Sequence, residues 1–325
     1  MRRILITGGT GFVGRHLVRF LRSFQAKLIV LSSGDVKTPQ PGVDYYKVDV
    51  RKSDDVWAVV RDASPQQIYH LAAISSVPAS WKDPRLTLDV NVTGSYNVLD
   101  AAMRLSSPPR ILNVSTSQVY APCDTALSET SPVAPDNPYA ASKAMAELLA
   151  IQYRKSTKGV VITARPFNHT GPGQAETFAL PSFARQLAEM EIGLRSPVLK
   201  VGNINVKRDF TDVRDIVVAY CELLEKGMGG EIYNVCSGRA LLLADLVKEL
   251  HRNCGVAVKI EVDPARVRPD DIPQIVGDPG KLHKTTGWLP KIPLERTLKE
   301  LLAYWREAIK QDAVDDNGAA TEALP

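Results

Sequence analysis

The sequence predicts an α/β protein built on a doubly wound parallel sheet of the Rossmann type, followed by a smaller carboxyl-terminal α/β lobe. Short β-branched runs alternate with helical patterns through the first half of the chain, and a glycine-rich turn follows the first run. The alternation ends after about Ala164, where RPFNHTGPGQ has too many turn residues for a helix or a central strand. Near-continuous apolar strands separated by helices are typical of a parallel sheet covered on both faces.

The first half supplies the strands and helices of the predicted sheet in alternation. Strands are predicted at Ile4–Thr7, Lys27–Leu31, Tyr45–Val48, Gln67–Leu71, Arg110–Ser115 and Val160–Ala164. Apolar residues at 3.6-residue spacing predict helices at Phe12–Arg22, Ser53–Arg61, about Trp81–Leu105 and Tyr139–Lys155.

The second half has a different organisation. Helices are predicted at Leu180–Met190, Val213–Glu225, Leu241–Arg252 and Pro293–Ile309, with strands at Val198–Val201, Glu231–Val235 and Val256–Val262. We therefore expect a dinucleotide-binding domain over residues 1–165, to which 210–236 returns, and a substrate lobe over 166–209 and 237–310. Residues 311–325 lack periodicity, which predicts a disordered tail.

Composition excludes several classes of protein. The net charge of +4, from 40 basic and 36 acidic residues, is too small to indicate nucleic-acid binding. The four cysteines are widely separated and no histidine stands at ligand spacing, so we expect reduced thiols and no metal site. The chain opens directly on the strand-like MRRILIT, and no apolar run reaches the roughly 18 residues of a membrane span. We expect a soluble cytoplasmic protein.

The glycine-rich turn TGGTGFVG places Gly8, Gly11 and Gly14 where the first strand becomes a helix that opens with Phe12 and Val13. Glycines allow a tight turn and a close approach of backbone to a pyrophosphate, which then lies at the positive end of the helix. Tight packing alone is the alternative explanation, and the spacing departs from G-x-G-x-x-G.

The end of the second predicted strand bears on cofactor choice. An acid at this place binds the ribose 2′-hydroxyl of NAD, but this chain has Ser32 and Ser33. Without a carboxylate to repel a 2′-phosphate, NADP(H) is favoured, with Arg15 or Lys37 as a source of positive charge. Asp35 stands only two residues beyond, and a solvated loop is the alternative explanation for Lys37.

A tyrosine and a lysine stand four residues apart at the start of the helix after the fifth strand. Tyr139 and Lys143 therefore share one helix face, where the ammonium lowers the phenol pKa and the phenol can exchange a proton at a carbinol. Ser115-Thr116-Ser117 ends the fifth strand, at the sheet edge where open parallel sheets bind ligands. A Tyr-x-x-x-Lys pair alone is more often a surface contact, but the three elements in this order point to one site.

Together these motifs resemble the extended short-chain dehydrogenase/reductase family, over Ile4 to about Trp305. The segments HLAA at His70–Ala73, Asp49-Val50, and NVTGSYNVLDAA from Asn91 are similar to landmarks of its cofactor domain. The resemblance implies that the adenine contacts Asp49 and Val50, and that the cofactor cleft is lined by Leu71, Ala72 and Ala73. It also implies that Thr116, Tyr139 and Lys143 form the catalytic trio.

The carboxyl-terminal half resembles members of that family that modify GDP-sugars, namely GDP-mannose 4,6-dehydratases and GDP-4-keto-6-deoxy-mannose reductases. The resemblance is carried by RPFNHTGPGQ, VGNINVKRDFTDVRDI, YNVCSG, RVRPDDIPQIVGDPGKL and TGWLPKIPLE. A nucleoside diphosphate requires cationic and amide donors, for which Asn168, Arg208 and Arg268 are candidates, with Lys207 assisting. An ordinary surface ion pair remains the alternative for each arginine.

One position separates dehydration from reduction. The dehydratases carry a Glu after the Ser-Thr-Ser segment for an additional acid–base step, whereas this chain has Gln118, next to Ser117 as a further substrate contact. The resemblance thus implies an NADPH-dependent oxidoreductase that reduces the C4 ketone of a GDP-4-keto-6-deoxy-hexose, as in the biosynthesis of GDP-6-deoxy-mannose or GDP-rhamnose. The alternatives are a GDP-mannose 4,6-dehydratase or other NDP-sugar dehydratase or epimerase, and a catalytically idle dinucleotide-binding protein.

The family resemblance also implies a homodimer joined through a four-helix bundle. The helical segments Trp81–Leu105 and Tyr139–Lys155 carry apolar residues on more than one face, which favours an additional buried surface. The candidates for core or interface are Val90, Val98, Met145, Leu148 and Leu149. Packing within one subunit is the alternative.

Overall fold

The computed structural model describes residues 1–156, 159–267 and 272–321, which form two compact units. The first unit comprises Met1–Phe167, Val213–Gly238 and Gly277–Pro290, and the second comprises Asn168–Asp212, Arg239–Val276 and Lys291–Pro325. Each unit has its own hydrophobic core.

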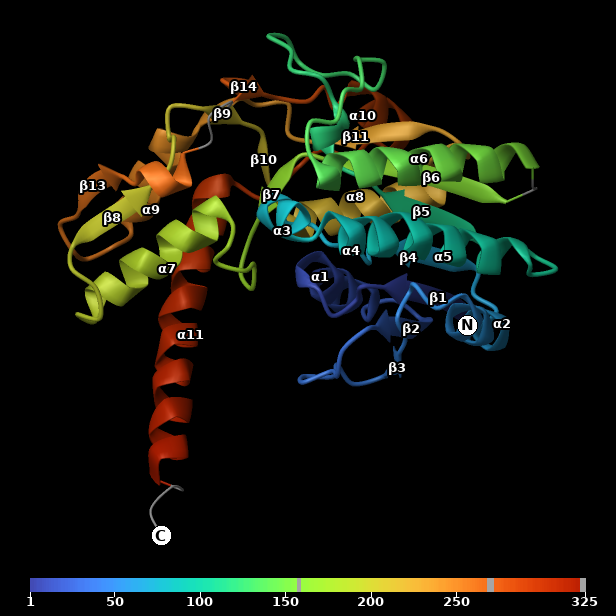
Figure 1. Cartoon of the computed structure of the whole chain (residues 1–325), viewed down its shortest axis with the longest axis horizontal. Helices are drawn as coiled ribbons and strands as arrows, with labels where there is room; N and C mark the ends of the chain where they lie inside the picture. Colours follow the sequence, from blue (N-terminus) through green and yellow to red (C-terminus); the bar gives the residue numbers. More distant parts are fainter. Residues whose placement is uncertain (157–158, 268–271, 322–325) are drawn as a thin grey trace. The chain divides into compact units, whose positions relative to one another are not determined.

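A seven-stranded parallel sheet forms the centre of the first unit (Figure 1). Its order is β11-β6-β5-β4-β1-β2-β3, and every adjacent pair is parallel. The strands are β1 (Arg2–Thr7), β2 (Ala26–Ser32), β3 (Val43–Lys47), β4 (Gln67–His70), β5 (Arg110–Val114), β6 (Val160–Pro166) and β11 (Ile232–Val235). The predicted doubly wound sheet is confirmed. Strand order reverses between β1 and β4, the place where such sheets bind ligands at their carboxyl ends.

Helices cover both faces of this sheet (Figure 1). One face packs on α1 (Phe12–Leu21), α8 (Val213–Lys226) and α10 (Gly280–Thr286). The other packs on α2 (Ser53–Ala63), α5 (Gly94–Met103) and α6 (Pro138–Ser156). Because both faces are covered, successive residues such as Ile4 and Leu5 are both buried, which explains the near-continuous apolar strands.

The single long helix predicted over Trp81–Leu105 is wrong. The segment forms α3 (Val77–Lys82), α4 (Pro84–Leu88), a π-helical turn at Asp89–Thr93, and α5. Pro84 cannot donate a backbone hydrogen bond to the preceding turn, and Asp83 instead accepts a bond from the Leu86 amide at 2.9 Å as the N-cap of α4.

The second unit combines three helices with three short sheets. The helices are α7 (Ala179–Glu191), α9 (Leu243–Arg252) and α11 (Leu294–Thr321). The sheets pair β7 (Asn168–Thr170) with β10 (Phe210–Asp212), β8 (Val198–Val201) with β13 (Lys259–Val262), and β9 (Lys207–Arg208) with β12 (Leu241–Leu242) and β14 (Gln274–Ile275). The core between the helices is rich in leucine, including the fully buried Leu187, Leu250 and Leu298.

Two boundary predictions differ from the structure. Residues 277–290, which the sequence assigned to the substrate lobe, belong to the first unit because Leu282 and Trp288 pack in its core. Residues 311–321, predicted to be disordered, continue α11.

A row of polar side chains crosses the buried sheet near its carboxyl edge. His70, Asn113 and Thr163 are aligned on β4, β5 and β6, and each is at most 3% exposed. Alternation along the strands puts Asn113 on the same face as Ile111, toward α5 and α6. The parallel sheet is therefore apolar along most of its length and polar where its ligand edge begins.

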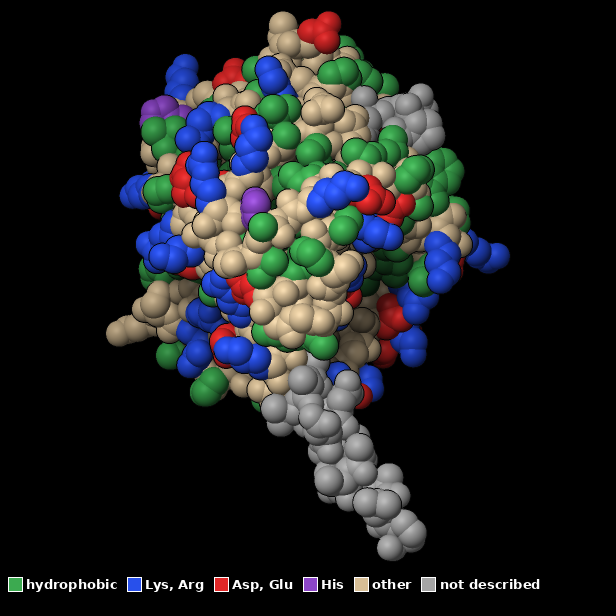
Figure 2. Space-filling view, turned by 90° about the vertical axis from the view of Figure 1, so that its left-hand side faces the viewer, with side chains coloured by type: hydrophobic (Ala, Val, Ile, Leu, Met, Phe, Trp, Pro, Cys, Tyr) green, Lys and Arg blue, Asp and Glu red, His purple; other side chains and the backbone are tan. Residues whose placement is uncertain are grey.

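The surface shows no single charged region on the face viewed in Figure 2, where Lys and Arg side chains alternate with Asp and Glu. Among the described residues, no helix is long and apolar enough to cross a bilayer. The same residues contain no group of three or more His, Cys, Asp or Glu side chains arranged to hold a metal ion.

Candidate active site

The glycine-rich turn is packed too closely for side chains. A Cβ atom on Gly8 would lie 2.8 Å from the Ala72 nitrogen, and Gly8 has a φ of +67°, which favours glycine. A Cβ atom on Gly14 would lie 2.2 Å from the Gly8 carbonyl oxygen. Gly11 is the N-cap of α1 and supplies no side-chain cap. The start of a helix after such a turn is the kind of place where proteins bind an anion such as a pyrophosphate.

The end of β2 has no carboxylate, as the sequence indicated. Ser32 is buried, and its hydroxyl donates to the Gly34 carbonyl at 3.0 Å and lies 3.1 Å from the Thr10 hydroxyl. The nearby acid, Asp35, is paired with Lys47 at 2.8 Å, and this hydrogen bond lowers the pKa of Asp35. The Asp35 carboxylate, two residues beyond Ser33, is thus already paired with a cation.

Asp49 and Val50, the predicted adenine contacts, follow β3. The Asp49 carboxylate binds Arg51 in a fork, with Nη2 to Oδ2 at 2.6 Å, and this pairing lowers the pKa of Asp49. The Val50 carbonyl accepts a bond from the Asn97 side chain at 2.9 Å. Both residues are therefore held by short polar contacts at the sheet edge.

A buried chain of hydrogen bonds holds the segment Leu71–Ala73. The Ala72 amide donates to the Thr7 hydroxyl at 3.1 Å, and Thr7 lies 2.8 Å from His70 Nδ1. His70 Nε2 lies 2.9 Å from the Ser95 hydroxyl, which donates to the Asn91 carbonyl at 2.6 Å. Because the Ser95 proton is used on that carbonyl, His70 must donate from Nε2 and accept at Nδ1. Burial lowers the pKa of His70 to about 3, so the ring is neutral.

The start of α6 positions the tyrosine and the lysine. Asn137 is the N-cap, accepting a bond from the Ala140 amide at 2.9 Å, and Pro138 opens the helix with the fixed φ that this position favours. Tyr139 and Lys143 then follow one turn apart, as predicted. Asn137 was missed from the sequence, although Asn before Pro is a recognisable helix start.

The structure brings Thr116 and Tyr139 together. Thr116 accepts the Gln118 amide at 3.2 Å, which leaves its own proton for another acceptor, and its hydroxyl lies near enough to the Tyr139 phenol to act on the phenol pKa. Burial raises the pKa of Tyr139, and the Thr116 hydroxyl partly offsets that effect. The pair can hold a carbonyl oxygen between two hydroxyl groups and pass it a proton.

Lys143 is only 3% exposed to solvent. Its pKa is lowered to about 8, because desolvation disfavours the charged form and the nearby Glu147 carboxylate only partly offsets this effect. Glu147 itself binds Arg165 of β6 through two bonds of 2.9 and 2.6 Å. Neither residue of this pair stands out in the sequence, because their pairing depends on how α6 packs on β6.

Gln118 stands two residues after Thr116. Its side-chain oxygen is 3.5 Å from the Asn137 amide nitrogen, and it is half-buried, while Ser117 beside it is 8% exposed. Asn137 accepts the α6 amide through its oxygen, so it presents nitrogen to Gln118. Gln118 thus faces Asn137 with its carbonyl group, which orients its own NH₂ away from Asn137.

The remaining predicted substrate contacts lie in the second unit. Asn168 is half-buried on β7. Arg208 on β9 donates from Nη1 to the carbonyls of Lys207 at 2.9 Å and Ile272 at 2.8 Å, so part of its guanidinium supports the backbone. Lys207 is exposed. Arg268 lies outside the described residues.

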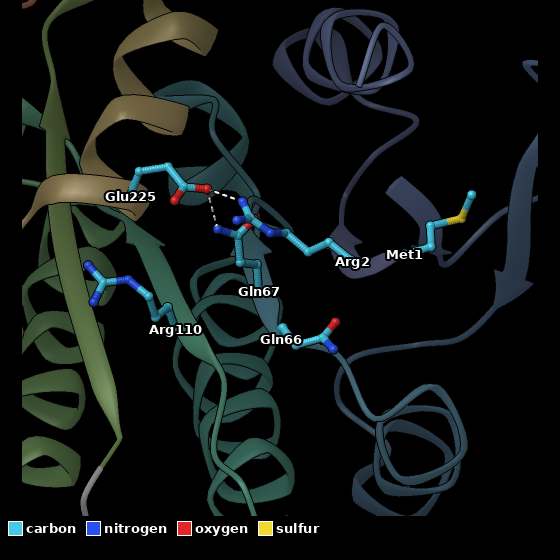
Figure 3. Close-up of a pocket in the computed structure, with 6 residues that line it drawn as sticks. All are labelled: Met1, Arg2, Gln66, Gln67, Arg110 and Glu225. Carbon is cyan, nitrogen blue, oxygen red and sulfur yellow. Dashed lines mark hydrogen bonds and ion pairs between the residues drawn. The ribbon is translucent and has the colours of Figure 1, made fainter. Parts of the chain in front are cut away.

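A cavity of about 510 Å³ lies at the opposite, amino-terminal edge of the sheet, lined by Met1, Arg2, Gln66, Gln67, Arg110 and Glu225 (Figure 3). Glu225 forms an ion pair with Arg2 and accepts a bond from Gln67 at 2.9 Å. Arg110 donates to the Leu224 and Gly227 carbonyls. These groups satisfy one another, and parallel sheets bind ligands at the other edge. We therefore assign the chemistry to the Tyr139 edge.

Comparison with known proteins gives consistent matches. The family model for GDP-mannose 4,6 dehydratase matches residues 5–301. GDP-6-deoxy-D-mannose reductase of Pseudomonas aeruginosa is 36% identical, over 96% of this chain and 99% of that protein. GDP-mannose 4,6-dehydratase of Yersinia enterocolitica is 26% identical, over 97% of this chain and 96% of that protein.

Solved structures match with similar coverage. RMD from Pseudomonas aeruginosa complexed with NADPH has a TM-score of 0.83 and 34% identity, over 94% of this chain and 100% of that chain. UDP-glucose 4-epimerase of Thermus thermophilus, in complex with NAD, has a TM-score of 0.82 and 28% identity, over 94% of this chain and 99% of that chain.

Proposed function

The chain belongs to the GDP-mannose 4,6-dehydratase family, and we propose that within it this protein is an NADPH-dependent reductase of the C4 ketone of a GDP-4-keto-6-deoxy-hexose. The family resemblance predicted from the sequence is confirmed. The observation that carries the proposal is the amide of Gln118, two residues after Thr116 and beside Asn137, the N-cap of the helix that carries Tyr139 and Lys143. The match to GDP-6-deoxy-D-mannose reductase along nearly the whole chain supports it.

The residues of the first unit fit NADPH. The turn at Gly8, Gly11 and Gly14 packs closely on its own backbone and on Ala72, and we propose that a pyrophosphate lies at the start of α1, beside Phe12 and Val13. We propose that Asp49 and Val50 contact the adenine and that Leu71, Ala72 and Ala73 line the cleft. Ser32 places no negative charge near a 2′-phosphate, and its hydroxyl proton is donated to the Gly34 carbonyl. The match to an NADPH complex supports this choice of cofactor.

The proposed mechanism gives each member of the trio one task. Bound NADPH supplies the hydride for the C4 carbon. Thr116 holds the C4 oxygen through its hydroxyl, and Tyr139 donates the phenol proton to that oxygen as negative charge develops on it. Lys143, protonated below its pKa of about 8, stabilises the phenolate that remains and holds the ribose of the nicotinamide.

The predicted substrate contacts are Ser117 and Gln118 of the first unit and Asn168 and Arg208 of the second. We propose that Arg208 meets a phosphate and that Asn168 supplies an amide. Arg268 remains a prediction. The product would be a GDP-6-deoxy-hexose of the GDP-rhamnose type.

Gln118 argues against the alternative dehydratase. Removal of the C6 hydroxyl requires a base at C5 and an acid at the departing oxygen, and an amide is neither near neutral pH. Loss of such a group costs about 10² to 10⁴ in rate. Reduction at C4 requires no group of this kind, because the substrate already lacks the C6 hydroxyl.

Absorbance of NADPH tests the proposal directly. With GDP-4-keto-6-deoxy-mannose, NADPH should be consumed in a one-to-one ratio with substrate, and mass spectrometry should find a product heavier by two hydrogens. With GDP-mannose and NADP⁺, no keto product should form. Dehydration of GDP-mannose at about 1 s⁻¹ or faster would refute the reductase and establish the dehydratase.

We also propose a homodimer. Apolar side chains of α3, α5 and α6 remain exposed, including Trp81 at 61%, Tyr96 at 47%, Met145 at 41% and Leu148 at 61%. The other candidates serve the core instead, since Val98 is buried and Val90 and Leu149 pack against the same cluster. Exposed apolar residues on neighbouring helices support a partner helix pair at this face, in a four-helix bundle.

The four free cysteines support a cytoplasmic location.

A further inference from the structure

Lys143 and Glu147 stand one helical turn apart on α6 but do not pair. Oppositely charged side chains at this spacing on a helix ordinarily attract each other. Among the described residues, Lys143 makes no ion pair, although it is almost completely buried. The Glu147 carboxylate is engaged elsewhere, by Arg165.

The ion pair between Glu147 and Arg165 is fixed by two hydrogen bonds and by further contacts of Arg165. Arg165 Nε meets Oε1 at 2.9 Å and Nη2 meets Oε2 at 2.6 Å, so both carboxylate oxygens are occupied. The two side chains are only 5% and 4% exposed. The guanidinium also lies over the Tyr120 ring, 4.6 Å from its centroid, and the Tyr120 hydroxyl is fixed by Asn234 at 2.7 Å. Strand β6 thus delivers a rigid cation to the carboxylate.

We propose that Arg165 is a positioning residue that occupies Glu147 and thereby prevents this carboxylate from capturing Lys143. Without Arg165, the Lys143 ammonium would turn toward Glu147, one turn along α6 and away from Tyr139. With Arg165 in place, the ammonium has no competing partner and remains available to Tyr139 and to a ribose hydroxyl. The inference rests on the proposed catalytic role of Lys143.

The charges around Lys143 allow a clear sign for each substitution. His70 on β4 is neutral because burial lowers its pKa to about 3, and Tyr139 is neutral because burial raises its pKa. Glu147 on α6 and Arg165 on β6 are therefore the charged pair that acts on the ammonium. Removing the cation alone should raise the pKa of Lys143 above about 8, and removing the carboxylate alone should lower it.

Three variants test the competition: Arg165→Gln, Glu147→Gln, and the two combined. We expect Arg165→Gln to weaken NADPH binding and to slow turnover by about tenfold or more, the equivalent of one pKa unit. Adding Glu147→Gln should restore most of that loss, because the competing carboxylate is gone. If the pair only stabilised the fold, the double variant would be no better than Arg165→Gln.

A titration of the ligand-free chain separates this inference from the proposed reaction. With lysines labelled by ¹³C at Cε, the Lys143 signal, assigned by its loss in Lys143→Met, should titrate at higher pH in Arg165→Gln and at lower pH in Glu147→Gln. If the Lys143 pKa changed equally or in the same direction in both variants, the inference would be overturned whether or not the substrate is correct.

If Arg165→Gln does not fold, Arg165→Lys and Glu147→Gln provide the test. Arg165→Lys should leave the Lys143 titration near that of the wild type, and Glu147→Gln should lower it. Any other result refutes the inference.

Discussion

The hydroxyl of Thr116, just after β5, acts on the phenol of Tyr139 in the first turn of α6 and lowers the pKa of that phenol. Burial makes the phenolate form of Tyr139 costly, and the hydroxyl of Thr116 lowers that cost. The end of β5 and the start of α6 thus bring a proton donor and a hydrogen-bond donor into one site.

Replacement of Tyr139 by Phe should remove the proton donor and little else. We expect turnover to fall by about 10² to 10⁴, the usual loss for a general acid, while NADPH binding changes little. Stopped-flow absorbance measures the first and fluorescence titration the second. The exposed Tyr46 of β3 provides a control, because Tyr46→Phe should leave both unchanged. A Tyr139→Phe enzyme with half the wild-type rate would place the proton donor elsewhere.

The activity should decline in alkaline solution as Lys143 loses its proton. The pKa of Lys143 is lowered to about 8, so the active ammonium form is present below that pH and is lost above it. The kcat/KM profile for NADPH oxidation should bend near pH 8. In Lys143→Arg the bend should disappear, since a guanidinium stays charged. A bend near the pKa of about 10.4 of an exposed lysine would contradict this assignment.

Stability should fall in mild acid because of His70. Its pKa is about 3 in the folded chain and about 6.5 when unfolded, so below pH 6.5 the unfolded chain binds the additional proton. Stability is therefore complete above pH 6.5 and is lost between 6.5 and 3, at up to about 1.4 kcal/mol per pH unit. Urea unfolding at several pH values should show a flatter dependence in His70→Gln. An identical slope in both proteins would exclude this explanation.

Cofactor preference should respond to a charge at the end of β2. The wild type should have a higher kcat/KM with NADPH than with NADH. Ser33 is exposed next to Ser32, and Ser33→Asp would place a carboxylate near the proposed 2′-phosphate. Repulsion between two close charges is worth about 1 to 4 kcal/mol near a surface, so the ratio should fall by about tenfold or more. Ser23→Asp, at the other end of the strand, serves as the control. Equal kcat/KM with both cofactors in the wild type would refute the preference.

Light scattering should report a particle of about twice the 35.6 kDa chain mass at micromolar concentration. Leu148→Glu should shift it toward the monomer, because a charge on the exposed apolar face of α6 cannot be buried without cost. Leu194 is 67% exposed in the second unit, so Leu194→Glu provides a matched control that should leave the particle mass unchanged. A monomeric wild type would remove the dimer.

Local patterns in the sequence were sufficient for much of the fold. Apolar runs located the strands of the central sheet, and the spacing of Tyr139 and Lys143 located their shared helix face. Neither the break before Pro84 nor the π-helical turn at Asp89–Thr93 was predictable from periodicity, because the apolar spacing continues through both. Residues 277–290 were misplaced because Trp288 joins the first core through a contact with Asp215 that no local pattern reveals.

The site was predictable only where its chemistry is local. Gly8, Thr116 and Lys143 belong to motifs whose spacing carries the signal. Glu147 and Arg165 are the counterexample: each is an ordinary charged residue in its own segment, and only the packing of α6 on β6 pairs them. Asn91 opens the motif NVTGSYNVLDAA, but its hydrogen bonds to Ile74 and Ser142 form only in the folded chain.

The polar row of His70, Asn113 and Thr163 also constrains how the strands can align. If β4 slipped by one residue, His70 would turn to the other face of the sheet and lose its contacts with Thr7 and Ser95. A sheet of uniform aliphatic strands would tolerate such a slip with little change in burial. The polar row makes misaligned sheets costly, so it contributes to the uniqueness of the native pairing rather than to its strength.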